Sequence, residues 1–303
     1  MCRLLALSST RRLSLRRIHQ ATRLASKIMR DQSDGFGFAV ASLDNSPPYI
    51  ERHALPESFA GVGRAAQAQA ALLPCLYEPT SATSGTLSPQ HRGAVLFHGR
   101  TATNAVGIEN THPFTKNDWT LAHNGVVQWE GEARQLDSTC DSEHLLNCFA
   151  LGSGLSDFKS LTGWAAWLAL APDGSLRAGR DSRTPLHVAW CASLASYIIG
   201  TTRADIAALS KGLGVRVTDA LAMPDNTEFR FGAGGHDDVT ATRHDGLAAR
   251  ASLASLASVA LGQDRREHGV IWRTAARTQD VLPLSHDAQS IAAWELENFH
   301  NSL

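Results

Sequence analysis

Met1-Cys2-Arg3-Leu4-Leu5-Ala6-Leu7 opens the chain, and the interpretation of the later segments depends on this stretch. The apolar run over residues 4–7 is typical of a short buried strand. Removal of Met1 leaves Cys2 with a free α-amino group beside its own thiol. That amine has an ordinary pKa of roughly 7.7–8.0, so a single residue carries both a nucleophile and a base that works near neutral pH. The stretch therefore predicts a buried strand that begins at Cys2, and by itself it leaves open whether Cys2 is an ordinary buried cysteine or a reactive one.

The composition is that of a globular chain. Its 303 residues, 43% of them apolar, are enough for one large domain, or for one domain and an appendage. The formal net charge of -1 gives no whole-chain electrostatic reason to bind nucleic acid or a membrane. The five cysteines are odd in number and show no CxxC spacing, which argues against a disulfide framework and a zinc ribbon. We expect a cytoplasmic protein with no membrane span, no metal and no cofactor.

Residues 11–30 show the spacing of an amphipathic helix. Its apolar side chains recur at helical intervals, at Ile18, Ala21, Ala25, Ile28 and Met29. The opposite face is cationic, with no acidic residue, and consists of Arg11, Arg12, Arg16, Arg17, Arg23, Lys27 and Arg30. We expect the N-cap of this helix among Ser8, Ser9 and Thr10.

The cationic face has three interpretations. It is a solvated helix face, a mitochondrial transit peptide, or a docking face for an acidic partner or a nucleic acid. A transit peptide would be removed together with Cys2, which the motifs described next require, so we set that interpretation aside. The other two stay open.

Polar motifs alternate with apolar strands between residues 94 and 151. These motifs are His98-Gly99-Arg100-Thr101-Ala102-Thr103, Glu109-Asn110-Thr111-His112-Pro113-Phe114, Ala122-His123-Asn124-Gly125 and Asp141-Ser142-Glu143. Each has an ordinary structural explanation when taken alone. Arg100 is a candidate for a salt bridge, residues 123–125 are typical of a hairpin turn, and Asp141 or Ser142 is suited to cap a helix over residues 144–151.

Taken together, these motifs resemble those of the class II glutamine amidotransferases, a branch of the N-terminal-nucleophile hydrolases. Two further motifs belong to the resemblance: Cys2-Arg3-Leu4-Leu5 and Asp34-Gly35-Phe36-Gly37. The resemblance covers residues 2–232, and within the family the motifs are most similar to those of the stand-alone members. It implies an α+β fold, a four-layer αββα sandwich, with residues 233–303 as a C-terminal extension of unknown role. The residue pattern by itself supports an α+β mixture with strands that end in the polar motifs.

The resemblance also implies the catalytic residues. Cys2 attacks the side-chain amide of glutamine and forms a γ-glutamyl thioester, while its own amine accepts the thiol proton. The side-chain amide of Asn124 and the backbone N–H of Gly125 form the oxyanion hole. Loss of one such donor typically costs about a hundred- to thousand-fold in rate.

Substrate selection requires opposite charges for the two ends of a free amino acid. The residues that the resemblance assigns to substrate binding are Arg100, Thr103, His123 and Asp141. Arg100, assisted by Thr103, holds the α-carboxylate as a bidentate fork, and Asp141 holds the α-ammonium.

Three classes of function are compatible with this sequence. The first is a glutaminase that supplies ammonia to a separate acceptor synthetase, docked through residues 233–303, the cationic helix, or both. The second is an amidohydrolase of a γ-glutamyl compound, as in ergothioneine synthesis. The third is a binding module that performs no chemistry. The sequence leaves the acceptor, the true γ-glutamyl substrate and the oligomeric state open.

Overall fold

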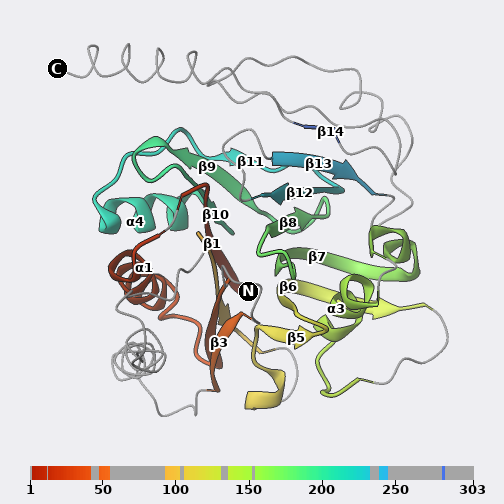
Figure 1. Ribbon diagram of the computed structural model, residues 1–303. Coiled ribbons are helices and arrows are strands. Elements are labelled where there is room, and N and C mark those ends of the chain that lie inside the picture. The colour runs from red at the N-terminus through yellow and green to blue at the C-terminus, as the bar shows by residue number, and fades with distance from the viewer. Residues whose placement is uncertain are drawn as a thin grey trace, which may run out of the picture.

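Two seven-stranded sheets packed face to face form the body of the protein in the computed structural model (Figure 1). The structure describes residues 2–11, 13–41, 48–54, 93–102, 106–130, 136–151, 154–232, 239–244 and 282–283. Helices α1 and α4 cover the outer face of one sheet, and α3 covers the outer face of the other (Figure 1). The expected four-layer αββα sandwich is therefore confirmed.

The first sheet has the strand order β11-β9-β10-β1-β4-β2-β3. Its strands are β1 (Arg3–Ser9), β2 (Gly35–Val40), β3 (Tyr49–Ala54), β4 (Ala94–Arg100), β9 (His187–Cys191), β10 (Ser196–Gly200) and β11 (Leu221–Ala222). Strand β1 is central and pairs antiparallel with β10 and β4. Its Leu4 and Ala6 face the second sheet, whereas Leu5 and Leu7 face the helices. The apolar run is unbroken because both faces of this strand are buried.

The second sheet has the order β14-β13-β12-β8-β7-β6-β5. Its strands are β5 (Phe114–Lys116), β6 (Trp119–Trp129), β7 (Leu161–Leu170), β8 (Leu176–Arg180), β12 (Thr227–Phe231), β13 (Val239–Arg243) and β14 (Leu282–Pro283). The last two strands belong to the segment beyond residue 232, and β13 pairs with β12 over five residues. The second sheet thus includes part of the C-terminal segment.

The helices begin at positions that differ from the expected ones. Helix α1 (Leu15–Ile28) has Ser14 as its N-cap, because Ser8 and Ser9 already belong to β1. Helix α3 (Ser142–Ala150) begins two residues earlier than expected. Helix α4 (Arg203–Leu213) starts with a capping box, and three short 3₁₀ segments are η1 (Ile108–Asn110), η2 (Gly154–Ser160) and η3 (Ala192–Leu194).

The expected hairpin turn at residues 123–125 is wrong. Strand β6 continues through these residues and pairs with β7 along nearly its whole length, with His123 opposite Trp167 and Gly125 opposite Ala165. Gly125 has a φ of 145°, and a Cβ atom placed there would collide with the Trp164 carbonyl oxygen. Glycine lets the strand pass this point without strain.

Apolar side chains fill all three spaces between the four layers. One cluster lies between the sheets and includes Leu4, Leu168 and Phe229. The others lie between each sheet and its helices. Among the described residues, none of the helices combines the length and the apolar character needed to cross a membrane.

Candidate active site

Cys2 lies at the entrance to β1, directly beside the end of β4. Its thiol donates to the Thr101 carbonyl oxygen at 3.3 Å, and the Thr101 N–H lies 3.4 Å from the Cys2 sulfur. Arg3 pairs with Gly99 in the sheet, so the antiparallel register brings residues 2 and 101 together. The predicted nucleophile therefore lies next to the motif that contains Arg100.

The start of β1 is held by neighbours on its other side. The guanidinium of Arg3 forms ion pairs with the buried Asp205 at 2.7 Å and with Asp31 at 3.2 Å. The N–H of Leu4 donates to the Thr201 hydroxyl at 2.8 Å. These contacts fix the backbone from which the Cys2 side chain extends.

The segment beside Cys2 is clamped by the loop before β2. The Thr101 hydroxyl donates to Gln32 Oε1, and the Ala102 N–H donates to Asp34 Oδ2, both at 2.6 Å. The Asp34 N–H in turn donates to the Arg100 carbonyl oxygen at 3.1 Å. Asp34 belongs to a motif quoted above, but its role as a backbone clamp was not predicted from the sequence.

The environment of Cys2 keeps its thiol protonated. Burial raises the pKa of Cys2 above its ordinary value of 9.0, although the Thr101 backbone and the positive charge of Arg100 act in the opposite direction. A thiol of this kind requires a base to become a nucleophile near neutral pH.

Asn124 and Gly125 lie on β6, which contacts β1 and β4 across the sandwich. Asn124 is 3% exposed, and its Nδ2 has no hydrogen-bond partner within the described part of the chain. A buried amide donor without a partner is costly, typically about 1–3 kcal/mol, so such groups are commonly found where a ligand binds.

Asp141 immediately precedes α3 but does not cap it with its side chain. Its Oδ2 instead accepts from the Val127 N–H of β6 at 2.7 Å. Its negative charge also raises the pKa of His123, against the larger effect of burial, which lowers that pKa overall. Asp141 is thus directed toward the strand that carries Asn124.

The charge of Arg100 connects the two halves of the site. Arg100 is buried, and its positive charge lowers the pKa values of both Cys2 and Cys140, although burial raises each of them overall. Cys140 immediately precedes Asp141, so positive and negative side chains border the same region.

The His123 ring bonds to the Ser142 hydroxyl behind the site, so its predicted contact with substrate stays a prediction. Thr103 lies outside the described residues. Nowhere in the described ranges do three or more His, Cys, Asp or Glu side chains form a group suited to a metal ion.

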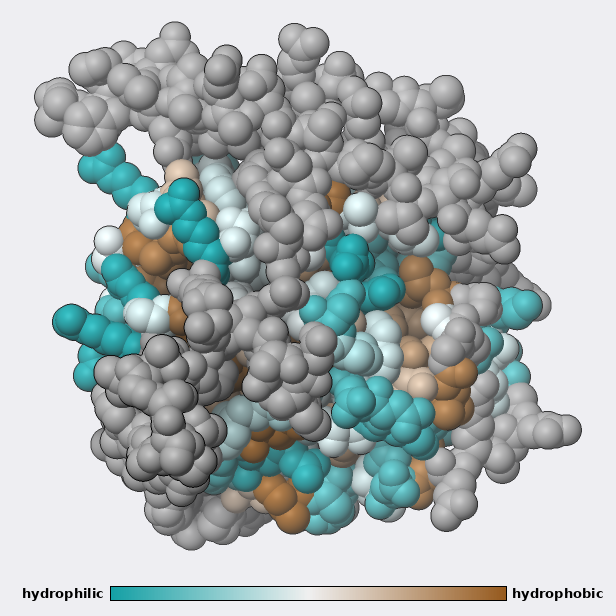
Figure 2. All heavy atoms as spheres, viewed as in Figure 1, coloured by the Kyte–Doolittle hydropathy of each residue, from teal (hydrophilic) through white to brown (hydrophobic). Residues whose placement is uncertain are grey.

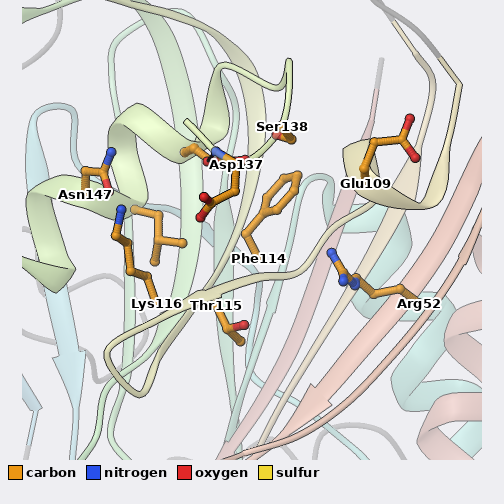
Figure 3. Close-up of a pocket in the computed structure, with 10 residues that line it drawn as sticks. Arg52, Glu109, Phe114, Thr115, Lys116, Asp137, Ser138 and Asn147 are labelled. Atoms are coloured by element: carbon orange, nitrogen blue, oxygen red, sulfur yellow. Dashed lines mark hydrogen bonds between the residues drawn. The ribbon is translucent and has the colours of Figure 1, made fainter. Parts of the chain in front are cut away.

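A cavity of 240 Å³ lies next to this region, between α3, β5, η1 and β3. Figure 3 shows Lys116 at one end of it and Arg52 and Glu109 at the other, with Phe114 and Asp137 between them. None of the predicted site residues that the structure describes lines it. The cavity is therefore a neighbour of the candidate site and not the site itself.

Two solved structures are similar in fold to most of this chain. Glutamine phosphoribosylpyrophosphate amidotransferase from B. subtilis, complexed with ADP and GMP, matches with a TM-score of 0.53 and 14% identity, over 80% of this chain and 49% of that chain. A structure described as the allosteric regulatory enzyme of purine biosynthesis matches with a TM-score of 0.55 and 14% identity, over the same shares. This chain thus matches about half the length of each.

Sequence comparisons find no such match. No family model matches the sequence, and no curated protein matches it significantly. The similarity is therefore one of three-dimensional structure, and at 14% identity it establishes the fold alone. The chain therefore shares its fold, two sheets packed face to face between helices, with about half of glutamine phosphoribosylpyrophosphate amidotransferase.

Proposed function

We propose that this chain is a class II glutamine amidotransferase, which hydrolyses the side-chain amide of glutamine at Cys2. The observation that carries the proposal is the buried Asn124 amide, which has no hydrogen-bond partner among the described residues and lies on a strand in contact with β1. A buried N–H donor without a partner, on a strand that contacts the strand after Cys2, is suited to bind the oxyanion that forms during acyl transfer. A binding module without chemistry does not need this arrangement.

The proposed reaction uses Cys2 as both nucleophile and base. After Met1 is removed, the α-amine accepts the thiol proton, and the sulfur attacks the amide carbon of glutamine. The carbonyl oxygen becomes an oxyanion held by Asn124 Nδ2 and the Gly125 N–H. The C–N bond then breaks, and ammonia leaves with the proton returned by the amine. Water hydrolyses the γ-glutamyl thioester to glutamate. The raised pKa of the Cys2 thiol supports a mechanism with a base.

Recognition of the amino-acid end rests on opposite charges. Arg100 binds the α-carboxylate, with Thr103 assisting, and Asp141 binds the α-ammonium. His123 completes the substrate side of the proposed site. The buried position of Arg100 supports this assignment, because a charge removed from water binds a carboxylate more strongly than an exposed one.

Glutamine hydrolysis by protein of verified N-terminal mass tests the proposal. Cys2→Ala should reduce the rate to background, whereas Cys191→Ala, which changes a buried cysteine of β9, should keep most of it. A form that retains Met1 should also be inactive, since its amine is no longer on Cys2. Normal activity of the Cys2→Ala variant or of the form with Met1 would show the mechanism to be wrong.

We also propose that the ammonia is passed to a separate acceptor enzyme with an acidic surface. Helix α1 has no acid in its first turn, and its Arg16, Arg23 and Lys27 are exposed. Figure 2 shows hydrophilic side chains over α1 and α4, on the side of the molecule away from β5. Concentrated positive charge on a chain of net charge -1 favours an acidic docking partner.

A charge-reversal variant tests the docking surface. Arg16→Glu, Arg23→Glu and Lys27→Glu together should leave glutamine hydrolysis unchanged and abolish retention of an acidic, ammonia-using synthetase in a pull-down. Retention by the variant would exclude this surface. Faster turnover of a larger γ-glutamyl amide than of glutamine would instead make the chain a self-sufficient amidohydrolase.

A further inference from the structure

Three buried histidines and one serine form a hydrogen-bonded cluster behind the candidate site. The Ser142 hydroxyl lies 2.7 Å from His112 Nε2 and 2.9 Å from His123 Nδ1. His98 Nε2 lies 3.1 Å from the His123 carbonyl oxygen, and the His98 and His112 ring centroids are 4.1 Å apart. Each of these four residues is at most 4% exposed.

The hydrogen bonds fix one ring proton and restrict the others. A carbonyl oxygen can only accept, so His98 must carry its proton on Nε2. The Ser142 hydroxyl has a single proton and lies within hydrogen-bond distance of both His112 Nε2 and His123 Nδ1, so it donates to at most one of these nitrogens and accepts from the other. The result is a chain of hydrogen bonds that joins His112 to His123 through Ser142.

Neutral rings are required for this chain. Burial lowers the pKa values of all three histidines, and their mutual charges act in the same direction for His98 and His112. For His98 the pKa falls to about 3. Each ring therefore has one donor and one acceptor at neutral pH, as the chain demands.

The cluster joins the elements that carry the three proposed substrate contacts. Ser142 directly follows Asp141, His123 directly precedes Asn124, and His98 lies two residues before Arg100 on β4. We infer that Ser142 is a positioning residue, which holds the Asp141 carboxylate and the Asn124 amide in register through its hydroxyl. This inference deepens the proposed function and rests on it. Ser142 itself touches no substrate.

Ser142→Ala is the decisive substitution, and Ser210→Ala is its matched control. Ser210 is also a buried helical serine, but its hydroxyl donates to the Ala207 carbonyl oxygen within α4 and not to any of the three clustered histidines. Loss of the Ser142 hydroxyl should lower kcat and raise KM for glutamine, with kcat/KM falling by up to about 100-fold. Ser142→Thr keeps a hydroxyl and should recover most of the loss.

Two further measurements separate positioning from folding. Alkylation of Cys2 by iodoacetamide needs neither the oxyanion hole nor the amino-acid contacts, so its rate should be the same in the wild type and in Ser142→Ala. A lower thermal midpoint with unchanged kcat/KM would instead make Ser142 a purely structural residue and overturn the inference. Failure of Ser142→Thr to recover activity, with its fold intact, would also count against it.

Nuclear magnetic resonance of the ring nitrogens tests the cluster without any activity. Ser142→Ala should shift the signals of His112 and His123 and leave those of His244, which lies elsewhere in the core, unchanged. Unshifted signals refute the cluster. If the wild type hydrolyses neither glutamine nor a larger γ-glutamyl amide while the signals shift as expected, the proposed function fails and the hydrogen-bonded cluster stands.

Discussion

Replacing Asp141 by asparagine removes one negative charge at the start of α3 and keeps the shape of the side chain. The Asn oxygen can still accept from the Val127 N–H, which now binds Asp141 Oδ2 at 2.7 Å. The fold should therefore tolerate the change. The proposed partner of the lost charge is the α-ammonium of glutamine, so the effect should fall on substrate binding.

The magnitude follows from the kind of bond that is lost. A hydrogen bond to a charged group typically contributes about 1.5–3 kcal/mol. Since about 1.4 kcal/mol corresponds to a factor of ten, KM for glutamine should rise by about 10- to 150-fold. Any change in kcat should be smaller, because the α-ammonium is remote from the reacting amide.

Steady-state glutamine hydrolysis and thermal unfolding of the same preparations provide the assay. Asp137→Asn is the control, because it makes the same chemical change four residues earlier in the chain. There the backbone N–H of Asp137, which the substitution keeps, donates to Glu143 Oε2. In the control variant, KM for glutamine should stay within about threefold of the wild type, which corresponds to a change in binding free energy of less than about 0.7 kcal/mol. An equal rise in both variants, or an unchanged KM in Asp141→Asn, would refute the assignment. Unfolding of Asp141→Asn alone would assign Asp141 a structural role.

Three other predictions concern the site and the core. Gly125→Ala should reduce glutamine hydrolysis by at least about a hundredfold, because its Cβ collides with the Trp164 carbonyl oxygen and displaces the proposed oxyanion donor; normal kcat would contradict this. Arg100→Gln should raise the pKa of the Cys2 thiol further, so the alkylation of Cys2 at a fixed pH should slow. Arg100→Lys should restore the alkylation rate. Equal alkylation rates in both variants would show that the charge at residue 100 does not affect the Cys2 thiol. Burial lowers the pKa of His244 from 6.5 to about 3. The neutral ring therefore contributes fully to the free energy of unfolding above pH 6.5, and this contribution falls by about 1.4 kcal/mol per pH unit as the pH drops from 6.5 toward 3. In urea unfolding between pH 7 and pH 5, the free energy of unfolding should depend less steeply on pH for His244→Phe than for the wild type. The same pH dependence in both proteins would refute this prediction.

Local sequence was sufficient to predict β1 and its burial. Four consecutive apolar residues after Arg3 leave no face of the strand for water, so a layer of structure must cover each side. The helical spacing of residues 11–30 predicts one of those layers, and α1 occupies it. The resemblance of the polar motifs to those of the class II glutamine amidotransferases implied the four-layer sandwich, whereas the residue pattern by itself predicted only an α+β mixture. The strand and the helix depend on neighbouring residues and on their periodicity.

Local sequence was misleading where long-range pairing outweighs it. Asn-Gly is a strong turn signal, yet Asn124 and Gly125 lie within a strand, because ten residues of β6 pair with β7. Asp141 has the position of an N-cap, yet its carboxylate bonds to β6. In each case a tertiary contact competes with the local preference and is the stronger of the two.

The sequence by itself determined the chemical identities at the predicted site: a cysteine directly after Met1, a cation, an amide and an acid. Only the tertiary structure decided which of these groups meet. Cys2 contacts Thr101 across 99 residues, and Ser142 joins His112 and His123 across 30 and 19 residues. Such contacts depend on strand register and on the packing of α3 against β6. A shift of one residue in either sheet would turn these side chains to the opposite face.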